Sequence, residues 1–314
     1  MVQPRVPSGR DGEVTAKADK RVIGVGLACL DQLLIWEDTS SPVESNKIMA
    51  SDLQGGGMAA TAMVAVSRLG GSAELWTAIG DDWVGDQILQ ALESEDVGTR
   101  YVIRIQGGRS LFIVVCVDQR TGERHFKPTA SRDKFEGEVG DFGLLPEAGC
   151  LLIDHALPDS ELRAAKEARL HGVPVVSDTG RFGEWQSRIL PYVDYAIVSE
   201  KGAKSLDDDP RKACEAIREM GAGCAVVTLG EKGLVYQDGD TRGELPAFDV
   251  EVVDTTGAGD VFHGAFCYGL VQGFSLAENL RFSSATSALK CQRLGGRAGI
   301  PTREQVDVFL KERG

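Results

Sequence analysis

Two glycines and a carboxylate stand close together in residues 252–262, which read Val-Val-Asp-Thr-Thr-Gly-Ala-Gly-Asp-Val-Phe. An apolar strand is expected to end before the threonines, and a helix is expected to begin after the glycines. Gly257 and Gly259 permit tight backbone geometry and a close approach to a ligand. The first N–H groups of a helix have no partner within it and, together with the helix dipole, attract anions. Gly257, Ala258 and Gly259 are therefore predicted to form an anion-binding turn.

Asp260 lies in the first turn of that predicted helix. A carboxylate beside a phosphate site does not serve phosphate binding alone, because the two negative charges repel each other. It is suited to accept a proton from a hydroxyl group that attacks the phosphate, so Asp260 is the predicted general base. The alternative is an Asp that stabilises a helix N-terminus after a simple turn. The length of the whole string favours the catalytic interpretation.

The composition is that of an ordinary globular chain with an acidic surplus. Its 314 residues are 42% apolar and 26% charged, and the net charge is −13. This charge argues against nucleic-acid binding, which depends on Lys and Arg, so any phosphate site must be built locally. No apolar run approaches the roughly 18 residues of a membrane span, so no membrane partner is expected. The seven cysteines are scattered without a CxxC pair, which predicts neither disulfides nor zinc and favours a cytoplasmic location.

Residues 1–20 are predicted to be a flexible tail, and residues 21–314 a single folded domain. Within it, short apolar runs alternate with amphipathic or small-residue segments, which predicts a doubly wound, mainly parallel α/β sheet flanked by helices. The expected strands are 22–27, 73–78, 150–154, 173–177, 195–199, 224–229 and 233–237, and the expected helices are 56–69, 84–93, 160–171, 210–220, 258–272 and 276–294.

Further strands lie outside this alternation, at about 31–53 and 100–128. Residues 101–105 and 110–117, joined through Gly107-Gly108, have the pattern of a β-hairpin, and a strand is expected near 124–127. These strands are expected to form a small separate sheet.

Asp254-Thr255-Thr256-Gly257-Ala258-Gly259-Asp260 resembles the C-terminal signature of the ribokinase-like (PfkB) carbohydrate kinases. Four other features resemble motifs of that family, and together they span about residues 21–310. They are Asp31 after the first strand, Gly56-Gly57 before a run of alanines ending in Arg68-Leu69-Gly70, Gly80-Asp81-Asp82, and Thr228-Leu229-Gly230-Glu231-Lys232-Gly233.

The resemblance implies an enzyme that moves the γ-phosphate of ATP to a primary sugar hydroxyl, with Mg²⁺ and with the small sheet as a lid. It implies that Asp260 is the base and that Gly257, Ala258 and Gly259 hold the transferring phosphate. Sugar contacts are implied for Asp31, Gly56, Gly57, Thr61 and Asp260, and nucleotide contacts for Thr228, Gly230, Gly233, Thr256, Gly257 and Gly259. A potassium-type ion near Asp254 and Thr256 is a further family-level expectation.

Two positions depart from the family pattern. Thr61 stands where the family usually has Asn, which alters one sugar hydrogen bond. Ser199-Glu200-Lys201-Gly202 stands in place of Asn-x-x-Glu, a motif that positions magnesium, and leaves Glu200 as the candidate replacement. No metal ligand is assigned from the sequence.

The motifs are most similar to those of the 6-deoxy-6-sulfofructose kinases, which phosphorylate C1 of a ketose with an anionic group at C6. Such a substrate needs basic side chains under the lid, and Lys47, Lys127 and Arg132 are candidates; residues 155–157 contain no Arg. Ribokinase, fructokinase, an adenosine-type nucleoside kinase and a non-catalytic sugar or nucleotide sensor are the alternatives. Exposed lid edges could pair between subunits, which predicts a homodimer.

Weaker signals have ordinary explanations beside the functional ones. His263 either tunes Asp260 or simply packs, and Arg297 either lies near phosphate or follows a glycine helix end. Lys290 is interpreted as a charge at a helix C-terminus, and Asp207-Asp208-Asp209 as a solvated loop and helix cap. Gly24-Val25-Gly26 lacks the third glycine of a dinucleotide fingerprint.

Overall fold

The computed structural model describes residues 20–38, 47–121, 124–129 and 139–313. The predicted tail therefore lies almost wholly outside the described residues. Nine strands form one sheet in the order β13-β12-β11-β10-β9-β8-β1-β4-β5. They are β1 Val22–Val25, β4 Ala73–Gly80, β5 Val102–Ile105, β8 Cys150–Ile153, β9 Val175–Thr179, β10 Tyr195–Ser199, β11 Cys224–Thr228, β12 Leu234–Asp238 and β13 Thr241–Leu245. All neighbours are parallel except β12, which is antiparallel to both β11 and β13.

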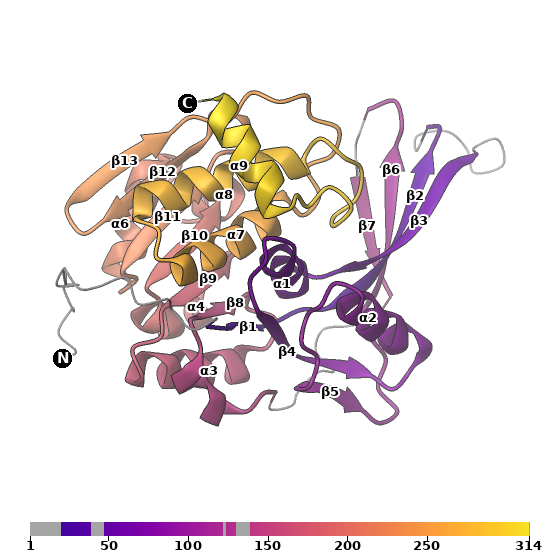
Figure 1. Ribbon diagram of the computed structural model, residues 1–314, viewed down its shortest axis with the longest axis horizontal. Coiled ribbons are helices and arrows are strands. Elements are labelled where there is room, and N and C mark those ends of the chain that lie inside the picture. Colours follow the sequence, from indigo (N-terminus) through magenta and orange to yellow (C-terminus); the bar gives the residue numbers. More distant parts are fainter. Residues whose placement is uncertain (1–19, 39–46, 122–123, 130–138, 314) are drawn as a thin grey trace.

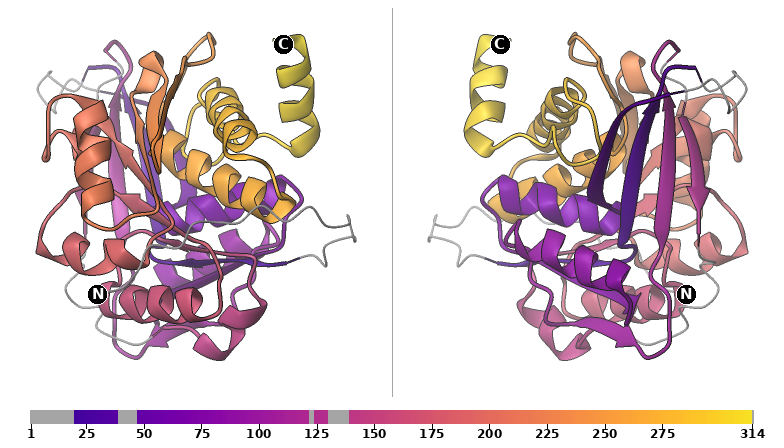
Figure 2. Two further views of the ribbon diagram at one scale, coloured as in Figure 1. Left: turned by 90° about the vertical axis from the view of Figure 1, so that its left-hand side faces the viewer. Right: turned by 90° about the vertical axis from the view of Figure 1, so that its right-hand side faces the viewer.

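Helices cover both faces of this sheet (Figures 1 and 2). On one face lie α1 Met58–Arg68, α7 Ala258–Gln272 and α8 Leu276–Lys290, and on the other α3 Pro158–Leu170, α4 Glu184–Ile189 and α6 Pro210–Glu219. Alternate strand residues point to opposite faces, so Val22 packs with the first group and Ile23 with the second. Burial on both faces explains why the central strands β1 and β8 are apolar throughout, whereas the edge strands β5 and β13 carry exposed charged residues. The predicted doubly wound α/β fold is confirmed.

Three further α-helices lie among the described residues, besides 3-10 turns at Phe142–Glu147, Leu190–Tyr192 and Gly230–Lys232. These helices are α2 Trp83–Glu93, α5 Glu200–Ala203 and α9 Arg303–Glu312. No helix of the described residues is long and apolar enough to cross a bilayer.

The small sheet contains β2 Cys29–Trp36, β3 Ile48–Gly56, β6 Phe112–Asp118 and β7 Arg124–Pro128, in the order β3-β2-β6-β7. Figure 2 shows it as a tall, narrow sheet along one side of the body. The predicted hairpin is wrong, because β5 pairs in parallel with β4 in the large sheet and not with β6. The chain crosses between the sheets over residues 106–111, where Gly107 has φ 68° and donates its N–H to Asp81.

The segment before the glycine turn is also different from the prediction. Residues 246–253 form no strand, and the side chains of Val252 and Val253 are more than half exposed. These two apolar residues alone are too short a run to predict a strand. The β12–β13 pair also already forms the neighbouring edge of the sheet.

Candidate active site

The glycine turn lies at the N-terminus of α7. Gly257 is the N-cap with φ 74°, in the left-handed region, and a Cβ there would lie 2.8 Å from the Gly296 carbonyl oxygen. A Cβ on Gly259 would meet nothing within 4 Å, so this position opens onto free space. The Ala258 N–H donates to the Thr255 carbonyl at 3.2 Å. The turn therefore offers the N–H groups of Gly259 and Asp260, whereas the N–H group of Ala258 is engaged within the turn.

Asp260 is half-buried in the first turn of α7. Burial, together with the negative charges of Asp178 and Asp154, raises the pKa of its carboxyl group to about 7, while His263 and Arg297 act in the opposite direction. A carboxylate whose pKa lies near neutrality is well matched to accept a proton at physiological pH.

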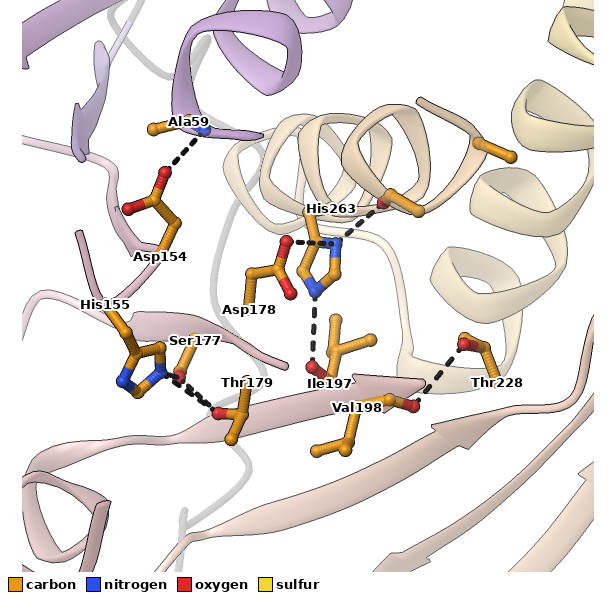
Figure 3. Close-up of polar contacts among 12 residues, drawn as sticks. Ala59, Asp154, His155, Ser177, Asp178, Thr179, Ile197, Val198, Thr228 and His263 are labelled. Carbon is orange, nitrogen blue, oxygen red and sulfur yellow. Dashed lines mark hydrogen bonds and ion pairs between the residues drawn. The ribbon is translucent and has the colours of Figure 1, made fainter. Parts of the chain in front are cut away.

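His263 lies one helical turn after Asp260 and is almost completely buried. Figure 3 shows its ring between Asp178 and the backbone of β10. Nδ1 lies 2.7 Å from the Gly259 carbonyl oxygen and 3.7 Å from Asp178 Oδ2, and Nε2 lies 3.3 Å from the Ile197 carbonyl oxygen. The ring thus both packs and joins the glycine turn to the ends of β9 and β10, so the two interpretations of His263 are not exclusive.

Asp31 and Arg297 explain why the neighbouring backbone is glycine. A Cβ on Gly56 would lie 2.2 Å from Asp31 Oδ2, and one on Gly55 would lie 2.0 Å from an Arg297 nitrogen. The guanidinium of Arg297 is buried and donates to the Gly56 carbonyl (2.9 Å) and to Thr61 Oγ1 (3.3 Å). Burial raises the pKa of Asp31 and lowers the pKa of Arg297 to about 10, with Asp31 and Asp260 opposing the latter change.

A buried carboxylate fixes the two segments on the other side of the Gly56-Gly57 backbone. Asp154, at the end of β8, accepts the N–H of Leu27 (2.8 Å) and of Ala59 (2.9 Å, Figure 3). Burial raises its pKa to about 6. Gly57, with φ 93°, lies against this loop, since a Cβ there would be 2.4 Å from the Leu27 carbonyl oxygen.

The predicted nucleotide turn follows β11. Thr228 Oγ1 donates to the Val198 carbonyl at 3.4 Å (Figure 3), and the Leu229 N–H donates to the Gly233 carbonyl at 2.7 Å. Gly230 and Gly233 have φ 61° and 90°, and a Cβ on Gly233 would lie 1.9 Å from the Leu245 carbonyl oxygen. Since β8, β9, β10 and β11 are parallel, their carboxyl ends share one edge with α7, which is where ligands bind in such sheets.

A glutamate cannot occupy position 202. A Cβ on Gly202 would lie 2.9 Å from the Gly180 carbonyl oxygen, so the backbone of the neighbouring loop fills the space. Glu200 pairs with Lys204 at 3.2 Å on the partly exposed side of α5. Within the described residues, no group of three His, Cys, Asp or Glu side chains is arranged to hold a metal ion on its own.

Comparison with known proteins decides the family. The model of the pfkB family of carbohydrate kinases matches residues 20–303. The chain belongs to this family. It is 29% identical to a ribokinase of Lactococcus lactis over 82% of this chain and 86% of that one, and 30% identical to fructokinase-1 of Zea mays over 82% and 88%.

Solved structures agree with this PfkB assignment. A putative ribokinase from Agrobacterium tumefaciens superposes with a TM-score of 0.89 at 29% identity, covering 94% of this chain and 99% of that one. The fold is shared with an Arabidopsis thaliana ribokinase complexed with ribose and ATP, at a TM-score of 0.82, 24% identity, and coverage of 94% and 99%. The chain is a sugar kinase, a phosphotransferase with an alcohol acceptor.

Lys47 and Lys127, two of the basic residues proposed from the sequence for an anionic substrate group, do not lie beside Asp31 in this PfkB kinase. Lys47 precedes β3 and stands about seven residues, or roughly 23 Å, along the strand from Gln54, the partner of Asp31. Lys127 pairs with Val114, so its side chain lies on the opposite face of the small sheet from Asp31 and Ile113. Arg132 lies outside the described residues.

Arg124 of β7 is a basic residue that the small sheet does bring to the loop before α7. It pairs with Val117, on the same face as Asp31, and reaches Asp254 Oδ1 at 2.5 Å and Thr255 Oγ1 at 3.2 Å. Sequence reasoning missed Arg124 and Asp178. Alternation along β7 could have indicated the face of Arg124, but no local pattern places it opposite residue 254.

Two weaker interpretations are settled by contacts. Asp209 accepts the Arg211 N–H at 2.9 Å as the N-cap of α6, as expected for a helix cap. Lys290 is the last residue of α8, as expected for a charge at a helix C-terminus, but its side chain has no exposed surface.

Proposed function

We propose that this kinase transfers the γ-phosphate of ATP to a primary hydroxyl of a sugar, with Asp260 as the general base. The observation that carries the proposal is a half-buried carboxylate whose pKa is raised to about 7, placed beside the open Gly259 position of the glycine turn. A base of that pKa is ionised in a large share of molecules at neutral pH and can still hold the proton it removes.

The sugar would lie between the lid and α1. The Asp31 carboxylate would accept hydrogen bonds from sugar hydroxyls, and the Gly56-Gly57 backbone allows the sugar to approach. Thr61 is already bonded to Arg297, so the altered Asn position is coupled to a buried guanidinium that fixes the floor of the pocket. Asp260 would take the proton of the attacking hydroxyl.

The nucleotide would lie along the carboxyl ends of β10 and β11. Thr228, Gly230 and Gly233 would line its base and ribose, and Thr256, Gly257 and Gly259 its terminal phosphates. The free N–H groups of the first α7 turn and the dipole of this helix would stabilise the negative charge on the transferring group.

Magnesium fits the carboxylates at this edge of the sheet. Oxygen ligands from one or two carboxylates and the phosphates are what Mg²⁺ usually takes, and Asp178, whose charge acts on Asp260, is the residue that would hold it and leave Asp260 free to accept the proton. The ion supplies charge neutralisation at the phosphates when it is bound.

The test is release of ADP with ATP and Mg²⁺ over ribose, fructose, fructose 6-phosphate, 6-deoxy-6-sulfofructose and adenosine. We expect turnover with at least one sugar and, on the motif resemblance, the highest kcat/KM with the sulfonated ketose. Asp260→Asn should lower kcat by about 100-fold or more while ATP still binds. Near-normal turnover of that variant would exclude Asp260 as the base, and ligand binding without ADP release from any acceptor would support the sensor instead.

A further inference from the structure

The oxygens of Asp254 are all engaged by donors of the chain itself. Its carbonyl oxygen accepts from Lys290 Nζ at 2.8 Å. Oδ1 accepts the Thr256 N–H at 2.7 Å and pairs with Arg124 at 2.5 Å, and Oδ2 accepts the Gly295 N–H at 2.7 Å. These hydrogen bonds hold the pKa of the Asp254 carboxyl group below its usual value, although burial acts in the opposite direction.

This arrangement does not fit a potassium-type ion at Asp254 and Thr256. Such an ion is held by oxygen lone pairs, commonly carbonyl oxygens that replace its water shell. Here the carbonyl and both carboxylate oxygens face N–H donors. Two of these donors, Lys290 and Arg124, carry positive side chains that would repel a cation at close range.

Lys290 is built into the core at the end of α8. Its side chain is completely buried, and its nitrogen lies against the start of the glycine turn. Burial lowers its pKa, while the charges of Asp254 and Asp260 act to keep the proton. A buried ammonium in such a position is costly unless a specific interaction requires it.

The end of α8 is fastened to the same turn by backbone and side-chain bonds. The N–H groups of Val253 and Asp254 both donate to the Cys291 carbonyl, at 2.8 and 3.0 Å. Ser287 Oγ donates to the Ala258 carbonyl at 2.8 Å. Lys290 therefore belongs to a rigid support under the residues that would hold the transferring phosphate.

We propose that the Lys290 ammonium takes the place of a monovalent cation in this kinase. It fixes the Asp254 carbonyl, and with it the turn that leads to Gly259, and when protonated it supplies a positive charge beside that turn. Lys290 is a positioning residue, and turnover is then independent of potassium. The kinetic effects expected from this proposal rest on the proposed function, whereas the effect of the salt on thermal unfolding does not.

The wild-type protein gives the first test. Turnover and the midpoint of thermal unfolding are measured in potassium chloride and in tetramethylammonium chloride at equal ionic strength. We expect both quantities to be the same in the two salts. Activation by potassium of about fivefold or more, the usual lower range for an effector, would overturn the proposal.

Lys290→Ala gives the second test, with Lys311→Ala, an exposed lysine of α9, as the matched control. In tetramethylammonium chloride, Lys290→Ala should lose about tenfold or more in kcat, because a displaced turn misplaces the phosphate. Potassium or ammonium should restore part of this loss and raise the unfolding midpoint of Lys290→Ala alone. Full activity of the variant without either ion would contradict the proposal.

The midpoint of thermal unfolding in the two salts separates the two proposals. If no sugar is phosphorylated in any salt, the proposed function fails, and the thermal midpoints still decide the role of Lys290. If Lys290→Ala does not fold in tetramethylammonium chloride but folds in potassium chloride, the replacement is supported. If it folds in neither salt, the wild-type comparison decides.

Discussion

The two sheets of this protein differ in how much of their surface is covered. In β1, β4 and β8 of the large sheet every residue is buried, because helices lie on both faces. In the lid, β3 is exposed from Ile48 to Leu53, and β7 is exposed after its first residue. The lid has only a small apolar cluster of its own, Leu33, Val115 and Val117 with Ile113 beside them.

The proposed chemistry lies where these unequal parts meet. Asp31 and Arg124 come from the lid, and Asp254 and Asp260 come from the loop and helix that follow the large sheet. The large sheet is buried on both faces, whereas the small sheet has few buried apolar contacts, and regions of this second kind open at a lower cost in free energy. We therefore expect substitutions in the large sheet to lower stability, and substitutions where the small sheet meets the site to weaken ligand binding.

The largest contrast should appear in stability. Ile153→Ala, which leaves a cavity in fully buried β8, should lower the free energy of unfolding by about 2–5 kcal/mol. Val114→Ala, in half-exposed β6, should lower it by about 1 kcal/mol or less. Urea unfolding followed by circular dichroism checks both values, and equal losses would show that the lid is as well packed as the large sheet.

The next contrast concerns the contact between the two parts. Arg124→Gln removes the lid charge that holds Asp254, and should raise KM for the sugar about tenfold, or about 1.4 kcal/mol, with a smaller effect on unfolding. Arg120→Gln is the matched control, because that side chain pairs with Asp38 at 3.1 Å and is mostly exposed. Equal kinetics for the two variants would mean that the Arg124 contact has no role in binding.

The pH dependence should sharpen the role of Asp260. A base must be ionised, so kcat/KM should fall about tenfold for each pH unit below a midpoint near 7, and Asp260→Asn should lack this limb. An acid limb with a midpoint near the ordinary Asp value would contradict the raised pKa.

The same pKa has a smaller consequence for stability. The pKa of Asp260 is raised in the folded state. The protonated carboxyl group therefore stabilises the fold at pH values below its pKa in the unfolded chain, and this stabilisation is lost as the pH rises through about 7. Asp260→Asn should therefore be more stable than the wild type at pH 8, by roughly 1–4 kcal/mol since three pKa units correspond at most to about 4 kcal/mol, and about equally stable near pH 4. Thermal unfolding at the two pH values measures the difference.

The family and the fold could be predicted from the sequence, because both depend on local signals. The string from Asp254 to Asp260 specifies a turn and a helix start within seven residues, and α7 spans 258–272 as expected. The alternation of buried strands with helices gave the mainly parallel sheet, since each strand shows its own apolar run. The site assignments, the sulfonated substrate, the dimer and the cellular location stay predictions.

Pairing between distant segments was decided only by the tertiary structure. The residues around Gly107 suggest a hairpin, yet β5 joins β4 and β6 joins β2, because a strand's partner depends on the edge it meets and not on its own turn. For the same reason, Arg124 and Lys290 could not be placed on Asp254 from the sequence. The sequence by itself determined which groups are available for chemistry, and the tertiary structure determined which charges oppose one another, because charge interactions depend on distance and burial rather than on separation along the chain.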